Sequence, residues 1–309
     1  MLKKFKEIFT NTGPKILVNK KLKYINLKNL NNVYFRSFGK LNKNKTFYII
    51  RGNPYEGFFS NITFILNHLK ICDNFKFIPI INMENYPTLH NEVVSIKKVK
   101  NTREYYFKKL NNYSLKEIYK SKNVFLSSTK FEKNMSLDMT DNTISTYFKK
   151  IKLKDSIVKK ANKFIKKNFK KNNKILGVYF RDSAYKTSRG HAFHPTIEQI
   201  IKNIELLIQK YKYNKIFLLS EDEKYLKVLQ EKFKNKLVFI KSFRMDKIDS
   251  IDIYPSNRRY LLGEEILIYT VILSKCQGLT YIKSNIISLA IMLAKKKIKL
   301  HEISLGLKK

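Results

Sequence analysis

The second half of the chain alternates short apolar runs with longer segments in which apolar residues recur at helical spacing. Residues 175–180 (ILGVYF) are almost wholly apolar, which is typical of a strand buried on both faces of a sheet. Apolar residues at 197, 200, 201, 204, 207, 208 and 211 then mark one face of a helix. The same pattern predicts strands at 215–220, 237–240 and 279–282, and helices from 155 toward 166–174, from Ser220 to about 234, at 264–275, and after Ser284.

Two capping boxes support these helix starts. Thr196 with Gln199, and Ser220 with Glu223, have the spacing at which two side chains satisfy the free backbone N–H groups of a first turn. The strand–helix alternation predicts a parallel sheet with helices on both faces. Ligands of such sheets bind beyond the carboxyl ends of the strands.

The first half has a less regular α/β pattern. We expect a strand at 46–50, a helix at about 60–70 and a strand at 77–81, with a glycine-containing loop between the first strand and the helix. The Lys- and Asn-rich stretch at 166–174 is the best domain boundary. The prediction is therefore two α/β domains, 1–165 and 166–309.

The length of 309 residues and a hydrophobic content of 43% fit two globular domains. No segment reaches the ~20 apolar residues of a membrane-spanning helix, and no secretory signal follows the Lys-rich start. Cys72 and Cys276 are too few for a disulfide framework, and no His/Cys cluster offers a metal site. We expect a cytoplasmic protein with buried thiols.

Positive charge is the most conspicuous feature of the composition: 63 Lys and Arg against 24 Asp and Glu give a net charge of +39. Nucleic acid, an anionic membrane or an acidic glycan would each be attracted to it. Only 8 of the 63 are Arg, and the lysines are spread along the whole chain. We therefore expect no nucleic acid partner, keeping a basic nucleic-acid-binding protein as an alternative. Loose association with an anionic membrane surface, aided by the basic start at 1–9, is favoured.

Three polar clusters follow predicted strands and should share one sheet edge: Arg181, residues 220–222 and residues 283–285. Arg181 is the foremost candidate, because a chain that nearly always uses Lys has Arg at a strand end. A guanidinium grips a diphosphate bidentately, as a departing diphosphate requires. Pairing with Asp182 is the structural alternative.

Other candidates lie in loops that precede helices. Gly57, Ser60 and Asn61 could present amides and polar side chains to a phosphate, or simply cap a helix. The Glu221–Asp222–Glu223 run resembles a metal-binding group, but helix capping explains most of it, so no metal is expected. His191 and His194, close together in a Gly-containing loop, are general-base or hydrogen-bonding candidates.

Together these motifs resemble the fucosyltransferase superfamily that includes core α-1,6-, α-1,2- and protein O-fucosyltransferases. GVYFR at 177–181, followed by AFHP at 192–195, is similar to the core α-1,6 motif of a His-x-Arg strand end leading to Phe-His-Pro. FLLSED at 217–222, VILS at 271–274, and the later Ser284, Asn285 and Ser288 follow the family's order. The loop at 57–61 resembles the Gly-rich loop of its first domain.

The resemblance implies a GT-B fold, with two Rossmann-like domains facing across a cleft, and a GDP-sugar held mainly by the C-terminal one. It implies inversion at the anomeric carbon, no metal and no cofactor beyond the nucleotide-sugar co-substrate. By position, Arg181 would hold the diphosphate, with Asn61 across the cleft and Asp222 near the guanosine. The implied donor-binding residues are Gly57, Ser60, Tyr179, Ser183, His194, Ser220, Glu221, Asp222, Tyr269, Ser284, Asn285 and Ser288.

The chain departs from the family pattern at Tyr179, where the family has His, and at Ala184 and Tyr269, where it has Asp. The family's acidic base has no counterpart, which leaves His191, or Glu84 or Glu92 from the first domain, as the base. We expect transfer of fucose, or otherwise another GDP-linked hexose or heptose, to a bacterial surface glycan or lipid-linked glycan, as in capsule or lipooligosaccharide assembly. A catalytically silent nucleotide- or glycan-binding homologue is the alternative.

Overall fold

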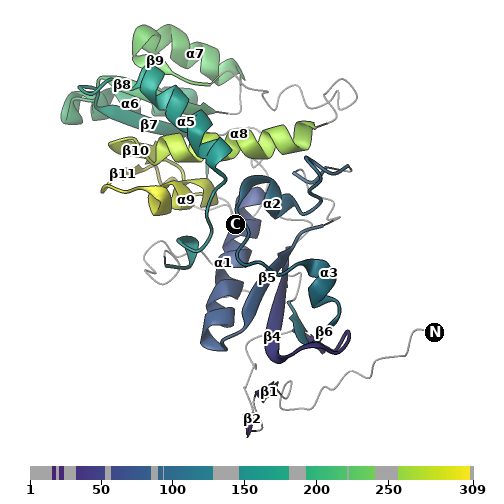
Figure 1. Cartoon of the computed structure of the whole chain (residues 1–309). Coiled ribbons are helices and arrows are strands. Elements are labelled where there is room, and N and C mark those ends of the chain that lie inside the picture. Colours follow the sequence, from purple (N-terminus) through teal and green to yellow (C-terminus); the bar gives the residue numbers. More distant parts are fainter. Residues whose placement is uncertain are drawn as a thin grey trace. The chain divides into compact units, whose positions relative to one another are not determined.

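A computed structural model describes residues 16–18, 21–23, 33–52, 57–84, 90–92, 94–127, 146–180, 193–220, 223–240 and 257–306. The chain forms two compact units, Met1–Leu153 and Lys154–Lys309 (Figure 1).

Helix α5 (Asp155–Asn168) lies in the second unit, whereas the sequence-based boundary at 165/166 assigns it to the first. The physical reason is its packing against α8 (Arg258–Leu273). Lys160 Nζ on α5 lies 2.6 Å from Oε2 of Glu264, a buried side chain of α8. Residues 166–168 of the Lys- and Asn-rich stretch thus form the last turn of a packed helix.

The first unit contains a sheet of strand order β3-β6-β4-β5. Strand β4 (Leu41–Arg51) runs parallel to β5 (Ile78–Asn82) and β6 (Ser121–Leu126), and β3 (Tyr34–Arg36) runs antiparallel to β6. A separate pair of short strands, β1 (Ile16–Val18) and β2 (Lys21–Lys23), is antiparallel.

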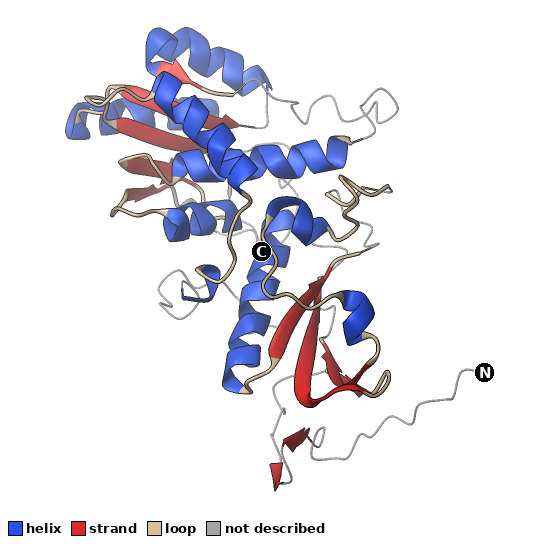
Figure 2. Cartoon of the chain, in the orientation of Figure 1, coloured by secondary structure: helices blue, strands red, loops and turns tan. Residues whose placement is uncertain are grey.

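Helices cover both faces of this sheet (Figure 2). The buried side chains of β4 alternate between the two faces, so each face needs a helix to pack against. Tyr48 faces α1 (Phe58–Asn74), where its hydroxyl hydrogen-bonds His68. Phe47 and Ile49 point the other way, into a core cluster with Ile118 of the short helix α3 (Leu115–Ile118). Helix α2 (Thr102–Tyr106) also lies in this unit.

The second unit contains an all-parallel sheet of strand order β11-β10-β7-β8-β9. Its strands are β7 (Ile175–Phe180), β8 (Lys215–Ser220), β9 (Leu237–Val238), β10 (Gly278–Tyr281) and β11 (Lys299–Glu302). The helices are α5, α6 (Ile197–Tyr211), α7 (Glu223–Phe233), α8 and α9 (Asn285–Leu293). The chain order of the strands reverses at the β7–β10 boundary.

Helices again cover both faces of this sheet. Leu176 and Val178 of β7 pack with Ile204 of α6 and Leu229 of α7 in one buried cluster. On the opposite face, Phe217 of β8 contacts aromatic rings of both α5 and α8. This arrangement fits the buried, continuously apolar strands that the sequence predicts.

Several predicted elements are confirmed to the residue: β7, α6 and β8. The first capping box is also present: the Gln199 N–H donates to Thr196 Oγ1 (3.3 Å) and the Thr196 N–H donates to Gln199 Oε1 (2.9 Å). Helix α8 begins at Arg258, before the predicted start at 264, because Glu264 is a buried mid-helix residue rather than part of the first turn. Strands β1, β2, β3, β6 and β11 are not among the predicted elements.

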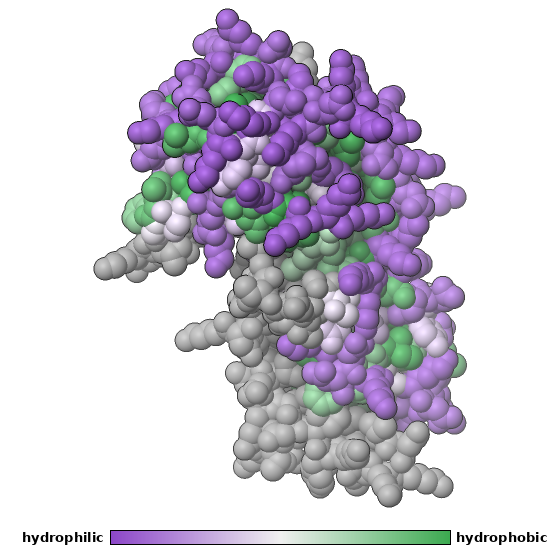
Figure 3. All heavy atoms as spheres, turned by 90° about the vertical axis from the view of Figure 1, so that its left-hand side faces the viewer, coloured by the Kyte–Doolittle hydropathy of each residue, from purple (hydrophilic) through white to green (hydrophobic). Residues whose placement is uncertain are grey.

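The lysines of the second unit are largely solvated. On α5, Ile157 and Ala161 are buried, whereas Lys159, Lys163 and Lys167 are exposed. Figure 3 shows hydrophilic residues over most of the visible face of this unit, with smaller apolar areas between them. Within the described residues, no helix has the length and apolar character that a bilayer-spanning segment needs.

A buried neutral histidine in the first unit gives a testable pH dependence. His68 is 1% exposed, shares a 2.9 Å hydrogen bond with Tyr48 Oη, and packs against the Phe64 ring. Burial lowers the pKa of His68 from 6.5 to about 3. Between pH 6.5 and about pH 3, the His68 imidazole is protonated in the unfolded chain but stays neutral in the folded chain. The contribution of neutral His68 to the free energy of unfolding is therefore fully present above pH 6.5 and is lost as the pH falls toward 3.

We expect His68 to lower the free energy of unfolding by about 2 kcal/mol between pH 7 and pH 5. Urea unfolding at both pH values measures this. His68→Gln should remove most of the pH dependence, whatever its effect on stability at pH 7. His301→Gln, in the second unit, should remove only the smaller contribution of His301, whose pKa is also lowered, first by burial, and should retain the larger one of His68. An unchanged pH dependence in His68→Gln would contradict the assignment.

Candidate active site

The carboxyl ends of three strands in the second unit lie at one edge of the sheet. Phe180, the last residue of β7, pairs with Ser220 of β8, and Tyr179 pairs with Tyr281 of β10. Since β8 and β10 flank β7 on opposite sides, this edge is the topological switch point of the sheet. In open α/β sheets such a point forms the ligand-binding crevice.

Helix α9 begins at this switch point, directly after β10. Its N-cap, Ser284, has an extended backbone and makes no capping hydrogen bond with its side chain. Ser284 Oγ is buried, and it has no hydrogen-bond partner among the residues that the structure describes. The helix has no acidic residue in its first turn, and exposed Lys283 precedes it. These features suit an anion, because free backbone N–H groups and the positive end of the helix dipole meet there.

Four other predicted residues occupy different positions around this sheet. Ser220 is buried at the end of β8, and Tyr179 is buried in β7. Tyr269, buried in α8, donates its hydroxyl proton to the backbone oxygen of Ile240 (2.9 Å), so it holds the segment that follows β9. His194 is half-buried in the segment that leads into α6.

The predicted donor-binding residues Ser284, Asn285 and Ser288 lie at the start of α9. Ser288 is buried, and its hydroxyl donates to the Ser284 backbone oxygen (3.2 Å), while Asn285 is the first residue of the helix. The predicted residues Arg181, Ser183, His191, Glu221 and Asp222 lie outside the described residues. For Arg181 the structure gives one constraint: the preceding residue, Phe180, ends β7 at the switch point.

The first unit has a comparable junction where β4 leads toward α1. A Cβ atom on Gly52 would lie 2.7 Å from Asn61 Oδ1 and 2.6 Å from Met83 Cε, so the Asn61 amide packs directly on the Gly52 backbone. Asn61 is only 7% exposed, and its Nδ2 donates to the Gly57 backbone oxygen (3.4 Å).

The N-terminus of α1 is open in the same sense as that of α9. The N-cap, Gly57, has no capping side chain, and a Cβ atom placed on it would meet nothing within 4 Å. The first turn contains no acidic residue, and Ser60 in it is half-buried. Gly57, Ser60 and Asn61 are thus brought together at one helix end, as the sequence analysis expected.

Glu84, a candidate base, lines a cavity of about 370 Å³ in the first unit. Its backbone N–H donates to Asn82 Oδ1 (3.1 Å) just after the carboxyl end of β5. Glu92, the other carboxylate considered, is half-buried and contributes to the raised pKa of Tyr105, which is due first to burial.

Two arginines of the first unit escaped the sequence analysis. Arg51 ends β4, and its backbone N–H and Nε donate to the Oγ (2.8 Å) and backbone oxygen (2.9 Å) of Ser127. Arg103 lines the same cavity as Glu84. Arginine is rare in this Lys-rich chain, which is why Arg181 is a candidate. The same rarity is the sequence feature that could have singled out Arg51 and Arg103.

Comparison with known proteins shows a likeness of fold. No protein-family model matches the chain, and no curated protein matches it. The structure of fucosyltransferase NodZ from Bradyrhizobium superposes with a TM-score of 0.54 at 13% identity, covering 81% of this chain and 93% of NodZ. NodZ alpha-1,6-fucosyltransferase soaked with GDP-fucose gives 0.53 at 13% identity, and NodZ co-crystallized with GDP gives 0.50 at 14%, with the same coverage.

The fold is therefore that of GT-B fucosyltransferases, with mixed α/β units built on parallel sheets, and the predicted fold class is confirmed. The resemblance that the sequence motifs indicate agrees with this likeness, although the shared identity is low.

Proposed function

We propose that the protein is an inverting, metal-independent glycosyltransferase that uses a GDP-sugar donor. The observation that carries this proposal is the switch point of the second unit, where β7, β8 and β10 end beside the uncapped N-terminus of α9. The NodZ structures that share the fold include one soaked with GDP-fucose and one with GDP, which supports the same nucleotide here. Fucose is the first choice of sugar, followed by another GDP-linked hexose or heptose.

In this proposal the donor diphosphate lies at the start of α9. Backbone N–H groups of the first turn, with Ser284 and Asn285, would hold its oxygens, and Ser288 would support Ser284. Arg181 would neutralise the charge that develops as the bond between the anomeric carbon and the diphosphate oxygen breaks. Asp222 and its neighbours would hold the guanosine.

The acceptor hydroxyl attacks the anomeric carbon as GDP leaves, and its proton passes to a base. We propose His191 as that base, with Glu84 as the candidate from the first unit. Asn61, fixed against Gly52, would orient a substrate oxygen through its amide. The acceptor proposed is a bacterial surface glycan or lipid-linked glycan, reached at the cytoplasmic face of the membrane.

The nucleotide is tested by thermal unfolding with GDP, UDP, CDP, ADP and GDP-fucose, each with and without EDTA. A nucleotide at 100 Kd should stabilise the fold by about 2.7 kcal/mol. We expect this for GDP and GDP-fucose, undiminished by EDTA. Stabilisation by UDP or CDP alone would contradict the donor, loss of the effect with EDTA would contradict metal independence, and no response at all would contradict the proposal.

A catalytically silent homologue is the second candidate, favoured by Tyr269, whose hydroxyl is bonded to Ile240 where the family has an Asp near the guanine. GDP-fucose hydrolysis and transfer assays separate the two. A protein that binds GDP but releases no GDP from GDP-fucose, with or without glycan acceptors, would be the silent one.

Gly52 offers a test of the role of Asn61. Gly52→Ala should displace the Asn61 amide, because the new methyl would lie 2.7 Å from its oxygen, and kcat should fall about tenfold, which corresponds to ~1.4 kcal/mol. Gly57→Ala is the matched steric comparison: its Cβ meets no atom within 4 Å and its φ of −64° suits alanine, so it leaves the Asn61 amide in place. Steady-state transfer kinetics of both variants measure the difference. Equal activity in the two would contradict a positioning role for Asn61.

A further inference from the structure

The cavity of the first unit has features that the proposed donor site does not use. Three segments form its walls: 79–84 at the end of β5, 98–104 leading into α2, and 109–116 leading into α3. Its volume of about 370 Å³ lies within the usual range for small-molecule sites.

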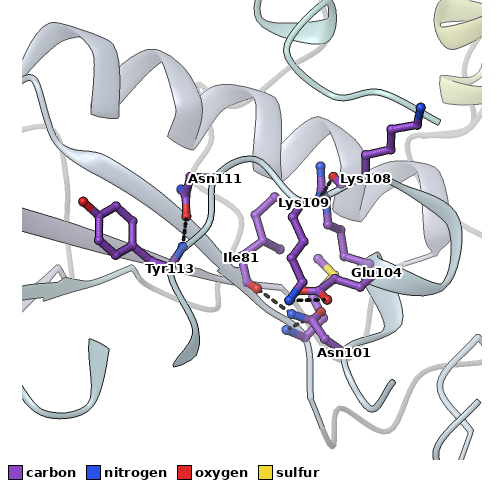
Figure 4. Close-up of polar contacts among 9 residues, drawn as sticks. Ile81, Asn101, Glu104, Lys108, Lys109, Asn111 and Tyr113 are labelled. Atoms are coloured by element: carbon purple, nitrogen blue, oxygen red, sulfur yellow. Dashed lines mark hydrogen bonds and ion pairs between the residues drawn. The ribbon is translucent and has the colours of Figure 1, made fainter. Parts of the chain in front are cut away.

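Hydrogen bonds from asparagine side chains hold these walls in place, and the one between Asn101 and Ile81 is drawn in Figure 4. Asn101 Nδ2 donates to the Ile81 backbone oxygen (2.7 Å), and Asn111 Nδ2 donates to the Pro79 backbone oxygen (2.7 Å). Because both amides bind the backbone of the β5 segment, the cavity is formed before any ligand arrives.

Arg103 is the unusual residue of this cavity. It is 4% exposed, its Nη1 donates to the Lys108 backbone oxygen, and its guanidinium lies 5.5 Å from the centre of the Phe107 ring. Its Nε and Nη2 atoms are also buried, and neither has a hydrogen-bond partner among the residues that the structure describes. A buried cation with unsatisfied donors is costly unless an anion or a polar group meets it.

The charges around Arg103 favour an anion. Lys98, Lys100, Lys109 and Lys116 line the cavity as well, against two carboxylates, Glu84 and Glu104. Glu104 is directed to Lys109, whose Nζ lies 3.7 Å from its Oε2 (Figure 4). The cavity lining therefore carries an excess of positive charge, and the buried guanidinium of Arg103 has two nitrogen donors without a partner among the described residues.

We propose that this cavity binds an oxyanion, the carboxylate or phosphate group of a sugar, with Arg103 as its central ligand. The Nε–Nη2 edge of a guanidinium can donate two parallel hydrogen bonds to one such group. Resting on the proposed function, the ligand is the acidic part of the acceptor glycan, and the lysines attract it by charge.

The test uses the arginine Nε–Hε NMR spectrum of the full-length protein, which is sparse because the chain has 8 arginines. The signal missing from Arg103→Lys assigns Arg103. The probes are glucuronate, glucose 6-phosphate and, as the neutral match, glucose. We expect the Arg103 signal to shift with one or both charged sugars and not with glucose. A shift with glucuronate alone would identify a carboxylate ligand, and a shift with glucose 6-phosphate alone would identify a phosphate ligand. If neither charged sugar shifts the Arg103 signal, the proposal is overturned.

Variants separate recognition from general attraction. Arg103→Lys keeps the charge but not the two-donor edge, and it should weaken binding of the active probe at least tenfold, followed by isothermal titration. Lys116→Ala, which keeps Arg103 and its packing intact, should weaken it two- to threefold. Lys122→Ala removes an exposed lysine of β6 that is not among the residues lining the cavity and should change nothing. Equal affinity in all three variants would overturn the proposal.

The two proposals fail separately. If GDP stabilises the protein but neither charged sugar shifts the Arg103 signal, only the cavity proposal is lost. If the Arg103 signal responds but no nucleotide binds, the oxyanion site stands and the proposed transfer reaction is lost.

Discussion

Arg181→Ala is expected to lower kcat for sugar transfer by about 10²- to 10³-fold, the usual cost of losing one donor that stabilises developing charge. Arg181 follows Phe180, the last residue of β7 at the switch point. In the proposed reaction the leaving diphosphate gains charge as its bond to the sugar breaks. A guanidinium there binds the transition state more strongly than the bound donor, so kcat should fall more than the affinity for GDP-sugar.

Two control variants sharpen this test. Arg181→Lys keeps one positive charge but not the bidentate fork, so we expect it to recover only part of the lost kcat. Arg36→Ala removes an arginine from edge strand β3 of the first unit and should leave kcat unchanged. Single-turnover measurements with saturating GDP-sugar separate chemistry from product release. A near-normal rate in Arg181→Ala would rule out its role at the diphosphate.

Gly278→Ala is expected to destabilise the second unit by about 3 kcal/mol, the upper end for inserting a methyl into a packed core. The new Cβ would lie 2.0 Å from Tyr213 Oη and 2.5 Å from Tyr213 Cζ. The Tyr213 ring is 3% exposed, and its hydroxyl shares a 3.2 Å hydrogen bond with His301 Nε2 on β11. Urea unfolding monitored by circular dichroism measures the loss.

A double variant tests the cause. Tyr213→Leu shortens the side chain that the new methyl would strike, so Gly278→Ala should cost at least 1 kcal/mol less in that background than alone, as expected for coupled neighbours. Gly57→Ala, whose Cβ meets no neighbour, is the glycine control and should stay within about 0.5 kcal/mol of the parent protein. Additive effects of the Gly278 and Tyr213 changes would show that the steric explanation is wrong.

The part of the fold that could be predicted is the part whose signal is local. The apolar run at 175–180 and the capping box at Thr196 mark β7 and α6 to the residue. The start of α8 was missed because the burial of Glu264 depends on Lys160 and Tyr260, which bond its carboxylate oxygens. Strand β11 reads KLHE, and its largely exposed, Lys-containing edge position gives no apolar alternation.

The candidate site divides in the same way. Residues at strand ends and helix starts, such as Ser284 and Asn61, follow from the α/β pattern because the topology of each unit puts such residues at the carboxyl edge of its own sheet. The close approach of Gly52 to Asn61 depends on how β4 meets α1 in space, and no local pattern indicates it. Arg103 lies in a polar stretch that suggests a solvated loop, and only tertiary packing buries it.

The all-parallel order of the second sheet also bears on how the chain acquires its structure during synthesis. Parallel neighbours need long crossovers, so no two of the described strands of this sheet form a hairpin that could fold early from adjacent residues. Ile175, at the start of β7, bonds Gln277, which is 102 residues later in the chain. At translation rates of about 5–20 residues per second, one side of β7 waits roughly 5–20 s for β10 to leave the ribosome. That apolar edge is therefore open to wrong pairing in the nascent chain, and added chaperones should raise the soluble yield.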